Sequence, residues 1–328
     1  MSQAPATPRY SIIIPAYNRA ESVQQTLQSC FDQTFSDFEI IVVDDGSTDT
    51  TLAVLNDIQD ARLRVVSQAN AGPAAARNHG MRLSRGQYLA FLDSDDSWYP
   101  EFLEMSNKVL DEQGEVLVYG QIVVDRGVGR YWVKPDRALA KGEPIYDYLY
   151  VHGGFIQTST MVIPMTLAEK VQWDESVTFG DNDQFAIDCW RTGITFCMLP
   201  RPCTHYADAI SEDALSQLPI YAGTSEKHTN FFTWMATQKS HMSPQAWAGY
   251  LARFESVGLA RRAPVQSFKL LWNARKLGAM SLPGIIRQSI QNMAPRQYRR
   301  LVDRYVRLRG ATLAEVRSAQ TTTRVPPV

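Results

Sequence analysis

The chain has 328 residues, of which 45% are hydrophobic and 20% charged, so it is long enough to bury a sizeable core. The formal net charge of −1 indicates no particular partner, but the charge is unevenly distributed. Residues 251–328 hold 15 Lys and Arg against 3 acids, whereas residues 1–250 hold 18 against 31. We interpret this asymmetry as a basic appendage on an acidic body.

Cysteine usage and apolar run length exclude several classes of protein. The four cysteines show no C-x-x-C spacing, so we predict reduced side chains rather than a zinc site or a disulfide framework. No run of about 18 apolar residues indicates a membrane-spanning helix, and the first residues lack the apolar core of a signal peptide. We therefore expect a cytoplasmic protein, either free or peripheral on the membrane.

The first third of the chain alternates between apolar runs typical of buried strands and amphipathic segments typical of helices. The predicted strands cover 10–14, 38–45, 63–68 and 87–93, and the predicted helices cover 21–33, 47–58, 72–84 and 100–114. This order predicts an α/β fold with a mostly parallel sheet flanked by helices.

After Gly114 the alternation loosens. Further strands are predicted over 116–125, 129–134, 159–164 and 194–200, with a helix over 185–193. From about residue 224 only helical periods remain, ending in a helix over 295–310 and a flexible tail. We divide the chain into an α/β domain, 1–223, with halves 9–113 and 114–223, and a basic α-helical C-terminal region, 224–328.

Polar side chains follow three of the predicted strands at the point where each ends. They are Ala16-Tyr17-Asn18, Asp44-Asp45 and Asp93-Ser94-Asp95. One acidic strand end is usually a cap or a turn. Because ligands of open parallel sheets bind beyond the carboxyl ends of the strands, three such ends together predict a binding site.

The acidic run after the fourth strand is typical of a metal site. Asp93 and Asp95 lie two residues apart, so their side chains point the same way from an extended chain. Paired carboxylates suit Mn²⁺ or Mg²⁺, and a cation also offsets their mutual repulsion. The sequence lacks the P-loop pattern and has no G-x-G-x-x-G after the first strand, so we expect a diphosphate to be held by metal.

Four motifs occur in a specific order: P-A-Y-N, D-D-G-S-T-D, N-x-G-x-x-x-A-R-N-x-G and D-x-D. Together they resemble the nucleotide-binding half of a family 2 glycosyltransferase, an inverting enzyme with the GT-A fold. The resemblance is strong over residues 10–105, weaker to about 210 and absent beyond 225. It implies that a sugar moves from a nucleotide donor to an acceptor hydroxyl, in surface polysaccharide or glycoconjugate synthesis.

The resemblance also implies roles for the strand-end residues. Asp45 would accept the N3–H of uracil, which favours a UDP-sugar because the N3 of cytosine is itself an acceptor. Asp93 would approach the ribose or the metal, and Asp95 would bind the metal. The remaining donor-binding candidates are Pro15, Ala16, Tyr17, Asn18, Asp44, Asn70, Gly72, Arg77, Asn78 and Ser94.

Inverting transfer needs a carboxylate that takes the proton of the acceptor hydroxyl. The family usually carries it in a Glu-Asp pair that opens a helix, whereas this chain has Asp181-Asn182-Asp183 at that place. We predict Asp181 as the base, with Asp183 as the alternative, and whichever is not the base as a helix cap. Trp173 is predicted either as an acceptor platform or as core.

Three weaker candidates remain. His205 is a third metal ligand by resemblance, or an ordinary side chain. Asp96 is interpreted as an acid in the first turn before Pro100. The segment 152–154, His-Gly-Gly, is a further pocket-loop candidate.

The C-terminal helices join apolar faces to arginine clusters. We expect them to pack on the catalytic domain or on a second copy of the chain, or to contact an anionic membrane surface, which would suit a lipid-linked saccharide acceptor. Nucleic acid is not expected as a partner, because no recognised binding motif accompanies the charge.

Two other functions compete with glycosyl transfer. A nucleotidyltransferase-like enzyme usually has a glycine-rich basic loop after the first strand, which is missing from 15–22. A catalytically silent nucleotide-sugar-binding module is disfavoured because both the D-x-D motif and the distal acids are present.

Overall fold

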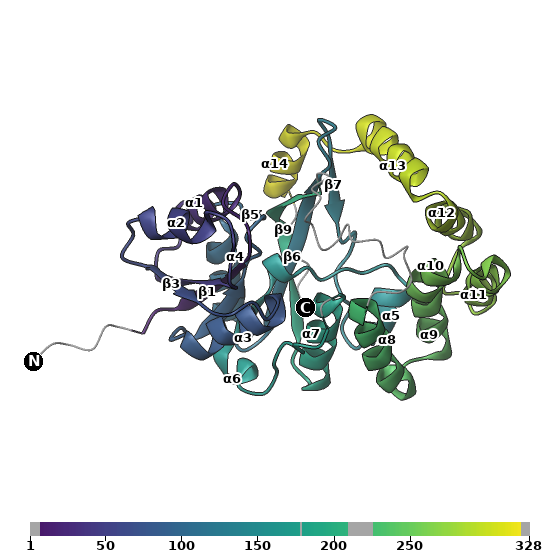
Figure 1. Ribbon diagram of the computed structural model, residues 1–328, viewed down its shortest axis with the longest axis horizontal. Coiled ribbons are helices and arrows are strands. Elements are labelled where there is room, and N and C mark those ends of the chain that lie inside the picture. The colour runs from purple at the N-terminus through teal and green to yellow at the C-terminus, as the bar shows by residue number, and fades with distance from the viewer. Residues whose placement is uncertain (1–6, 178, 209–225, 323–328) are drawn as a thin grey trace, which may run out of the picture.

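The computed structural model describes residues 7–177, 179–208 and 226–322. A curled sheet with helices on both faces forms the body of the molecule (Figure 1). The C-terminal helices form an arc that starts beside this body and returns to it near β7 and β9 (Figure 1).

The first part of the sheet is parallel, as predicted. It consists of β1 (Tyr10–Ala16), β2 (Phe38–Asp44), β3 (Leu63–Ser67) and β4 (Tyr88–Phe91), in the order β3-β2-β1-β4. Every residue of β1 and β2 is buried, which is typical of parallel strands covered on both faces. The strand β1 continues through Pro15, beyond the point where its pairing with β4 ends at Ile13.

The second part of the sheet is mixed. It consists of β5 (Ser97–Trp98), β6 (Leu117–Asp125), β7 (Tyr131–Lys134), β8 (Val162–Pro164) and β9 (Phe196–Ala207). The short strand β8 lies antiparallel between β4 and β6, and β6 is parallel to β9. The sheet as a whole is therefore mixed rather than mostly parallel, because β8 reverses the chain direction beside β4.

Two predicted strands have different bounds in the structure. The segment 159–164 forms a strand only from Val162, because Thr158–Thr160 is a 3₁₀ turn. The strand predicted over 194–200 continues to Ala207 across Pro200 and Pro202. Register shifts against β6 around Gln121 accommodate this irregular stretch.

Seven helices accompany the described strands up to residue 208. They are α1 (Val23–Phe31), α2 (Thr51–Asp57), α3 (Pro73–Leu83), α4 (Phe102–Gln113), α5 (Ile145–Tyr150), α6 (Met165–Ala168) and α7 (Asp181–Arg191). The helix α3 begins with proline at its first position, after Gly72 with φ +92°. These helices confirm the α/β pattern predicted from the sequence.

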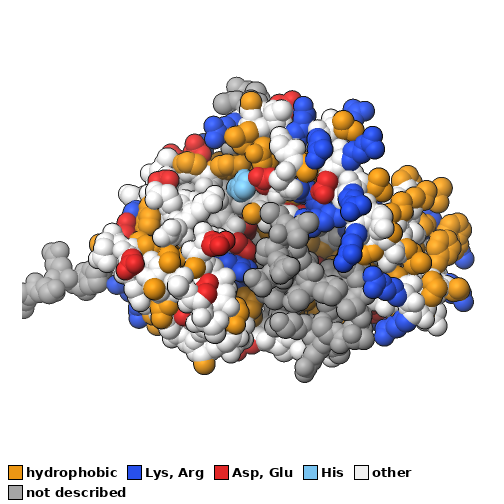
Figure 2. All heavy atoms as spheres, turned by 45° about the horizontal axis from the view of Figure 1, so that its top comes forward, with side chains coloured by type: hydrophobic (Ala, Val, Ile, Leu, Met, Phe, Trp, Pro, Cys, Tyr) orange, Lys and Arg blue, Asp and Glu red, His pale blue; other side chains and the backbone are white. Residues whose placement is uncertain are grey.

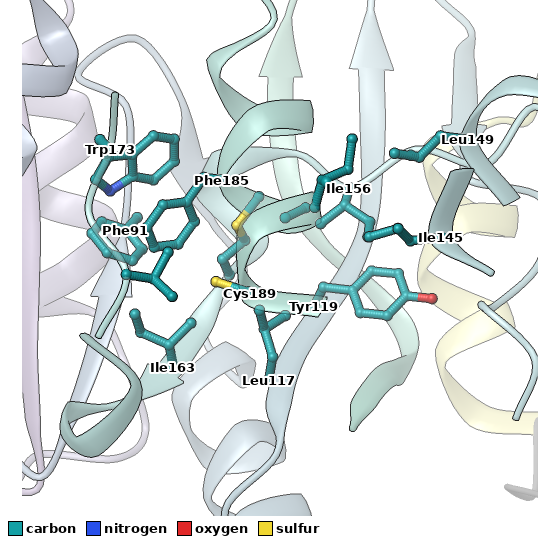
Figure 3. Packing of buried hydrophobic residues seen from close by; sticks show 14 of the residues in the cluster. Phe91, Leu117, Tyr119, Ile145, Leu149, Ile156, Ile163, Trp173, Phe185 and Cys189 are labelled. Carbon is teal, nitrogen blue, oxygen red and sulfur yellow. The ribbon is translucent and has the colours of Figure 1, made fainter. Parts of the chain in front are cut away.

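Apolar side chains fill both faces of the sheet. On one face Trp173 stacks on Phe185, with ring centroids 4.1 Å apart, and Phe91 meets both rings edge-on (Figure 3). Trp173 is 1% exposed, so it belongs to the core and not to an acceptor platform. All four cysteines are free, in agreement with the prediction of reduced side chains.

The C-terminal region packs into the same core. It contains α8 (Glu226–Gln238), α9 (Pro244–Tyr250), a π-helical segment (Leu251–Glu255), α10 (Ser256–Leu259), α11 (Pro264–Lys276), α12 (Leu282–Met293), α13 (Pro295–Arg309) and α14 (Leu313–Thr322). Phe231 and Tyr250 are buried in the cluster that holds Trp173. The predicted boundary at 223–224 lies outside the described residues and stays a prediction.

The end of the helical arc is fixed to the sheet. Arg126, just after β6, donates to Asp303 of α13, and Tyr131 and Ala311 exchange backbone hydrogen bonds. None of the helices within the described ranges is long and apolar enough to cross a bilayer.

Candidate active site

The ends of β1, β2 and β4 lie side by side, as the strand-end residues predict. Ala16 pairs with Asp44, and the amide of Leu92 donates to the carbonyl of Ile13, so Asp93 follows next to β1. Pro15, Ala16, Asp44 and Ser94 are all buried. The Ser94 carbonyl accepts a hydrogen bond of 2.9 Å from the Ser22 hydroxyl. The fold therefore gathers the three predicted polar strand ends at one edge of the sheet.

Asp45 organises the loop that leads into α3. Its carboxylate accepts hydrogen bonds from the Gln68 amide at 2.8 Å and from the backbone amides of Ala71 and Gly72 at 2.9 and 2.8 Å. Asn70 donates back to the carbonyl of Asp45 at 2.9 Å. One hydrogen-bonded unit thus contains the residues predicted to lie near the nucleobase, which are Asp45, Asn70 and Gly72.

Asn18 joins the first two strand ends. It adopts a left-handed backbone conformation, with φ 52°, and its side-chain oxygen accepts from the amide of Thr48 at 2.8 Å. Its own amide donates to the Ser47 hydroxyl. Tyr17 beside it is 44% exposed, which leaves its ring accessible to a ligand.

Arg77 connects the donor side of the site with the predicted base. Its guanidinium donates to Asp93 Oδ1 and to Asp181 Oδ2, both at 2.7 Å. The side chain is 5% exposed and lies over the Trp173 ring, 4.5 Å from its centre. Burial opposes the charge of Arg77, whereas the two carboxylates raise its pKa. Arg77 therefore fixes the orientation of both acids.

Asn78, next to Arg77, contacts the segment that precedes α7. It exchanges hydrogen bonds with the backbone of Trp173, donating at 2.9 Å and accepting at 3.0 Å, and it donates to Glu175. Asn78 therefore holds the segment before α7 against α3, and its role beside the donor stays a prediction.

The first turn of α7 separates the two candidate bases. Gly180, with φ +70°, starts the helix, and a Cβ there would lie 2.6 Å from the Phe231 ring. Asp183 turns inward, where it accepts a hydrogen bond of 3.1 Å from Tyr150, and burial raises its pKa to about 6. Asp181 is 20% exposed, and its Oδ1 has no hydrogen-bond partner within the described residues. This geometry favours Asp181.

The acidic turn after β4 concentrates negative charge. Burial raises the pKa of Asp95, and repulsion by Asp93 adds to the shift. Arg19 Nη2 lies 3.4 Å from Asp95 Oδ2, so a cation already faces this carboxylate, whose side chain is 46% exposed. Asp95 is thus both accessible and incompletely neutralised.

Asp96 does not open a helix turn, contrary to the prediction. It is 3% exposed, and its carboxylate accepts from the Ser159 hydroxyl at 2.5 Å and from the Gln157 amide at 3.3 Å. Burial, Asp93 and Asp95 raise its pKa. Asp96 therefore anchors the acidic turn to the 3₁₀ turn at Thr158–Thr160.

His205 lies on β9, next to Ser97 of β5. Its Nε2 is 3.2 Å from Asp125 Oδ2, a residue of β6. Across the three described ranges, no three His, Cys, Asp or Glu side chains form a ready metal cluster. The metal role of His205 stays a prediction.

The predicted pocket loop contacts other residues. His152 lies 3.7 Å from Glu143, and Gly153 faces the guanidinium of Arg253. A separate pocket, lined by Lys170, Asp188 and Arg191 among others, lies at the opposite end of α7 from Asp181 and shares none of the site residues.

Sequence reasoning missed Arg19, Gln157 and Ser159. Gln157 and Ser159 hold Asp96, and Ser159 also accepts from the backbone amide of Asp93 at 3.0 Å. The 3₁₀ turn was hidden inside an apparent strand, so no local pattern pointed to it. Figure 2 shows acidic side chains near the middle of one face and a row of Lys and Arg side chains farther to the right on the same face.

Comparison with known proteins agrees with this geometry. Residues 11–171 match the model of glycosyl transferase family 2. The amylovoran biosynthesis glycosyltransferase AmsB of Erwinia amylovora is 29% identical over 71% of this chain and 79% of its own length. An uncharacterized glycosyltransferase of Rickettsia typhi is 32% identical over 55% of this chain, but the match spans only 58% of that relative.

Two solved structures share the fold. Staphylococcus aureus TarS 1–349 in complex with UDP-GlcNAc has a TM-score of 0.61 at 16% identity, covering 89% of this chain and 92% of that one. The mannosyltransferase of Pyrobaculum calidifontis in complex with GDP-Man and Mn²⁺ has a TM-score of 0.56 at 18% identity, covering 96% and 87%. Residues 11–171 therefore belong to glycosyl transferase family 2, and the chain has a GT-A-type fold.

Proposed function

We propose that this glycosyltransferase moves a sugar with inversion from a UDP-sugar to an acceptor hydroxyl. The observation that carries the proposal is the double contact of Arg77 with Asp93 and Asp181, which joins the donor edge of the sheet to a partly exposed carboxylate. The similarity to an amylovoran biosynthesis glycosyltransferase supports surface polysaccharide or glycoconjugate synthesis as the setting.

The donor would bind across the ends of β1, β2 and β4. Tyr17 offers an exposed ring to the nucleobase of the donor. Asp45 offers a carboxylate that three hydrogen-bond donors hold in place. Only one of these three donors binds Asp45 Oδ2, so this oxygen keeps the capacity to accept a second hydrogen bond, from the N3–H of uracil.

Asp181 would act as the general base. Arg77 occupies its Oδ2, which leaves Oδ1 to take the proton as the acceptor oxygen attacks the anomeric carbon. The bond from that carbon to the diphosphate oxygen breaks as the new one forms, with inversion. The second candidate, Asp183, is engaged with Tyr150 and faces away from this position.

A divalent cation, Mn²⁺ or Mg²⁺, fits the acidic turn. The Asp95 side chain is 46% exposed, burial raises its pKa and repulsion by Asp93 adds to the shift, so a cation there would remove an existing repulsion. Asp95, with Asp93 beside it, would hold the ion, and the ion would stabilise negative charge on the departing diphosphate. His205 on the neighbouring strand β9 is the third ligand candidate.

A panel of nucleotide-sugars in thermal denaturation experiments tests the proposed donor. The account predicts a rise in the melting temperature with UDP-sugars in the presence of Mn²⁺, and a smaller rise after chelation, because a ligand that binds only the folded state stabilises it. Equal stabilisation by GDP-, CDP- and UDP-sugars would contradict the role given to Asp45.

The C-terminal arc is proposed to contact an anionic membrane surface. Three of its helices expose apolar side chains at helical spacing: Val265, Phe268 and Trp272 on α11, Leu282, Ile286, Ile290 and Met293 on α12, and Leu301, Tyr305 and Leu308 on α13. In Figure 2 hydrophobic side chains form an orange patch on the right of the molecule, and Lys and Arg side chains border it. An apolar face beside net positive charge suits anionic lipid, which would bring the enzyme to a lipid-linked acceptor.

A further inference from the structure

Arg19, in the loop between β1 and α1, faces the acidic turn that follows β4. Its backbone amide donates to the hydroxyl of Thr51 at 2.7 Å, so the main chain of this arginine is fixed to the start of α2. Its guanidinium Nη2 lies 3.4 Å from Asp95 Oδ2. Arg19 therefore places a positive charge against the carboxylate that is proposed to bind the metal.

The start of α1 holds the acidic turn beside this arginine. The Ser22 hydroxyl donates to the carbonyl of Ser94 at 2.9 Å, and the Thr26 hydroxyl donates to the carbonyl of Asp96 at 2.7 Å. These contacts lie on either side of Asp95 in the sequence and involve the main chain of the turn. The carboxylate of Asp95 therefore stays within reach of the arginine whatever its own side chain binds.

The ion pair of Arg19 with Asp95 is weak enough to be exchanged. Its distance of 3.4 Å is longer than the 2.7 Å that Arg77 keeps to each of its two acids. The side chain of Arg19 is 21% exposed, against 5% for Arg77, and its guanidinium also donates to the carbonyl of Asn18 at 3.3 Å. A long, partly solvated ion pair contributes little stability, so a stronger cation is able to displace it.

The acidic turn benefits from the charge that Arg19 supplies. Burial and repulsion by Asp93 raise the pKa of Asp95, and the positive charge of Arg19 opposes that shift. A divalent cation on the same carboxylate would supply a larger positive charge and would repel the guanidinium. Arg19 and the metal are therefore alternative partners of Asp95.

We propose that Arg19 is an exchangeable counter-ion of the acidic turn, which leaves Asp95 when metal and donor bind and then pairs with the donor diphosphate. Its backbone stays fixed to Thr51, so the released guanidinium remains at the donor edge, where diphosphate oxygens suit an arginine. The exchange makes metal and nucleotide bind cooperatively, because each favours the arrangement that the other needs. This inference rests on the proposed function, since it concerns the same donor and metal.

Metal binding without nucleotide tests the first half of the exchange. The full chain is titrated with Mn²⁺, and free Mn²⁺ is followed by electron paramagnetic resonance. Arg19→Gln and Arg19→Met should each bind Mn²⁺ about fivefold more tightly than the wild type, because no guanidinium competes for Asp95. Arg19→Lys keeps the charge and should stay near the wild type. Arg62→Gln is the matched control, because Arg62 pairs with Asp60 just before β3, at the opposite end of the strands.

Calorimetric titration with UDP in saturating Mn²⁺ tests the second half. The dissociation constant of UDP should rise about tenfold or more in Arg19→Gln, because a charged hydrogen bond to the diphosphate is lost. Uridine, which has no phosphate, should bind Arg19→Gln and the wild type equally. Mn²⁺ affinity that does not increase in the charge-removing variants, or UDP affinity that does not fall, would overturn the proposal. A wild type without Mn²⁺-dependent UDP binding would instead refute the proposed function, so the two failures are distinguishable.

Discussion

Arg77 Nη1 lies 2.7 Å from Asp181 Oδ2, although the two residues are 104 positions apart in the sequence. The same guanidinium holds Asp93, so one buried cation sets the relative position of the donor-side carboxylate and the candidate base. The buried charge of Arg77 also contributes to the stability of the fold, because removing it leaves both carboxylates without their partner.

Arg77→Gln should therefore impair both stability and catalysis. We expect a loss of about 3–5 kcal/mol in the free energy of unfolding, because two carboxylates lose their partner in a partly buried site. Chemical denaturation of the variant and the wild type measures this loss. Arg82→Gln, on the same helix α3, is the control and should change the stability little. A fully stable Arg77→Gln protein would refute the bridging role.

Asp95→Asn should abolish metal-supported UDP binding while the fold persists. The side chain is 46% exposed and forms an ion pair only with Arg19 among the described residues, so we expect little packing to be lost. Calorimetric titration with UDP in the presence and absence of Mn²⁺ measures the effect. Asp57→Asn, an exposed acid at the end of α2, is the control. Unchanged Mn²⁺-dependent affinity in Asp95→Asn would rule out a metal at this turn.

Asp183 should make stability depend on pH. Its pKa is about 6 in the folded protein, above the usual value of 3.8, because burial disfavours the charge. The folded state therefore binds more protons than the unfolded state between these values, and stability falls as pH rises from about 4 to about 6. Asp183→Asn keeps an acceptor for Tyr150, so it should be more stable than wild type at pH 7.5 by about 2–3 kcal/mol.

At pH 4 the advantage of Asp183→Asn should largely disappear, because the wild-type carboxyl is then protonated as well. Thermal denaturation at both pH values checks this difference. A variant that is less stable than wild type at pH 7.5 would show that the charged form of Asp183 is needed by the fold.

The exposed apolar stripes should control membrane binding. A Phe268→Ser, Trp272→Ser, Ile286→Ser variant tests this better than removal of the whole C-terminal region. Tyr250 and Phe254 belong to that region and pack against the core beside Asp181. Sedimentation with anionic vesicles at low salt should recover the wild type in the pellet and this variant in the supernatant, and neutral vesicles should bind neither. Equal recovery of both proteins with anionic vesicles would contradict the membrane proposal. A wild type that forms a stable dimer through these stripes would contradict it as well.

Local pattern was sufficient to predict the first four strands, their helices and the polar strand ends. Each of these features follows from the alternation of apolar and polar residues and the order of elements in a stretch of about 30 residues. The position of β8 and the extension of β9 across two prolines were not predictable, because pairing with distant strands overrides local propensity.

The candidate site shows the same division. Asp181 and Asp183 both stand in the first turn of α7, and only the tertiary contacts with Arg77 and Tyr150 distinguish them. Likewise, the burial of Asp96 results from its contact with Ser159, which lies 63 residues away in the sequence. Contacts of this kind leave no periodic trace in the sequence.

Comparing Asp181→Asn with Asp183→Asn tests the central claim most directly, by turnover of a UDP-sugar and by affinity for UDP in Mn²⁺. The account predicts that Asp181→Asn loses about 10²–10⁴-fold in rate, because the proton acceptor is removed, while its UDP affinity stays near that of the wild type. Asp183→Asn should keep most of the rate. An active Asp181→Asn beside an inactive Asp183→Asn would contradict the assignment of the base.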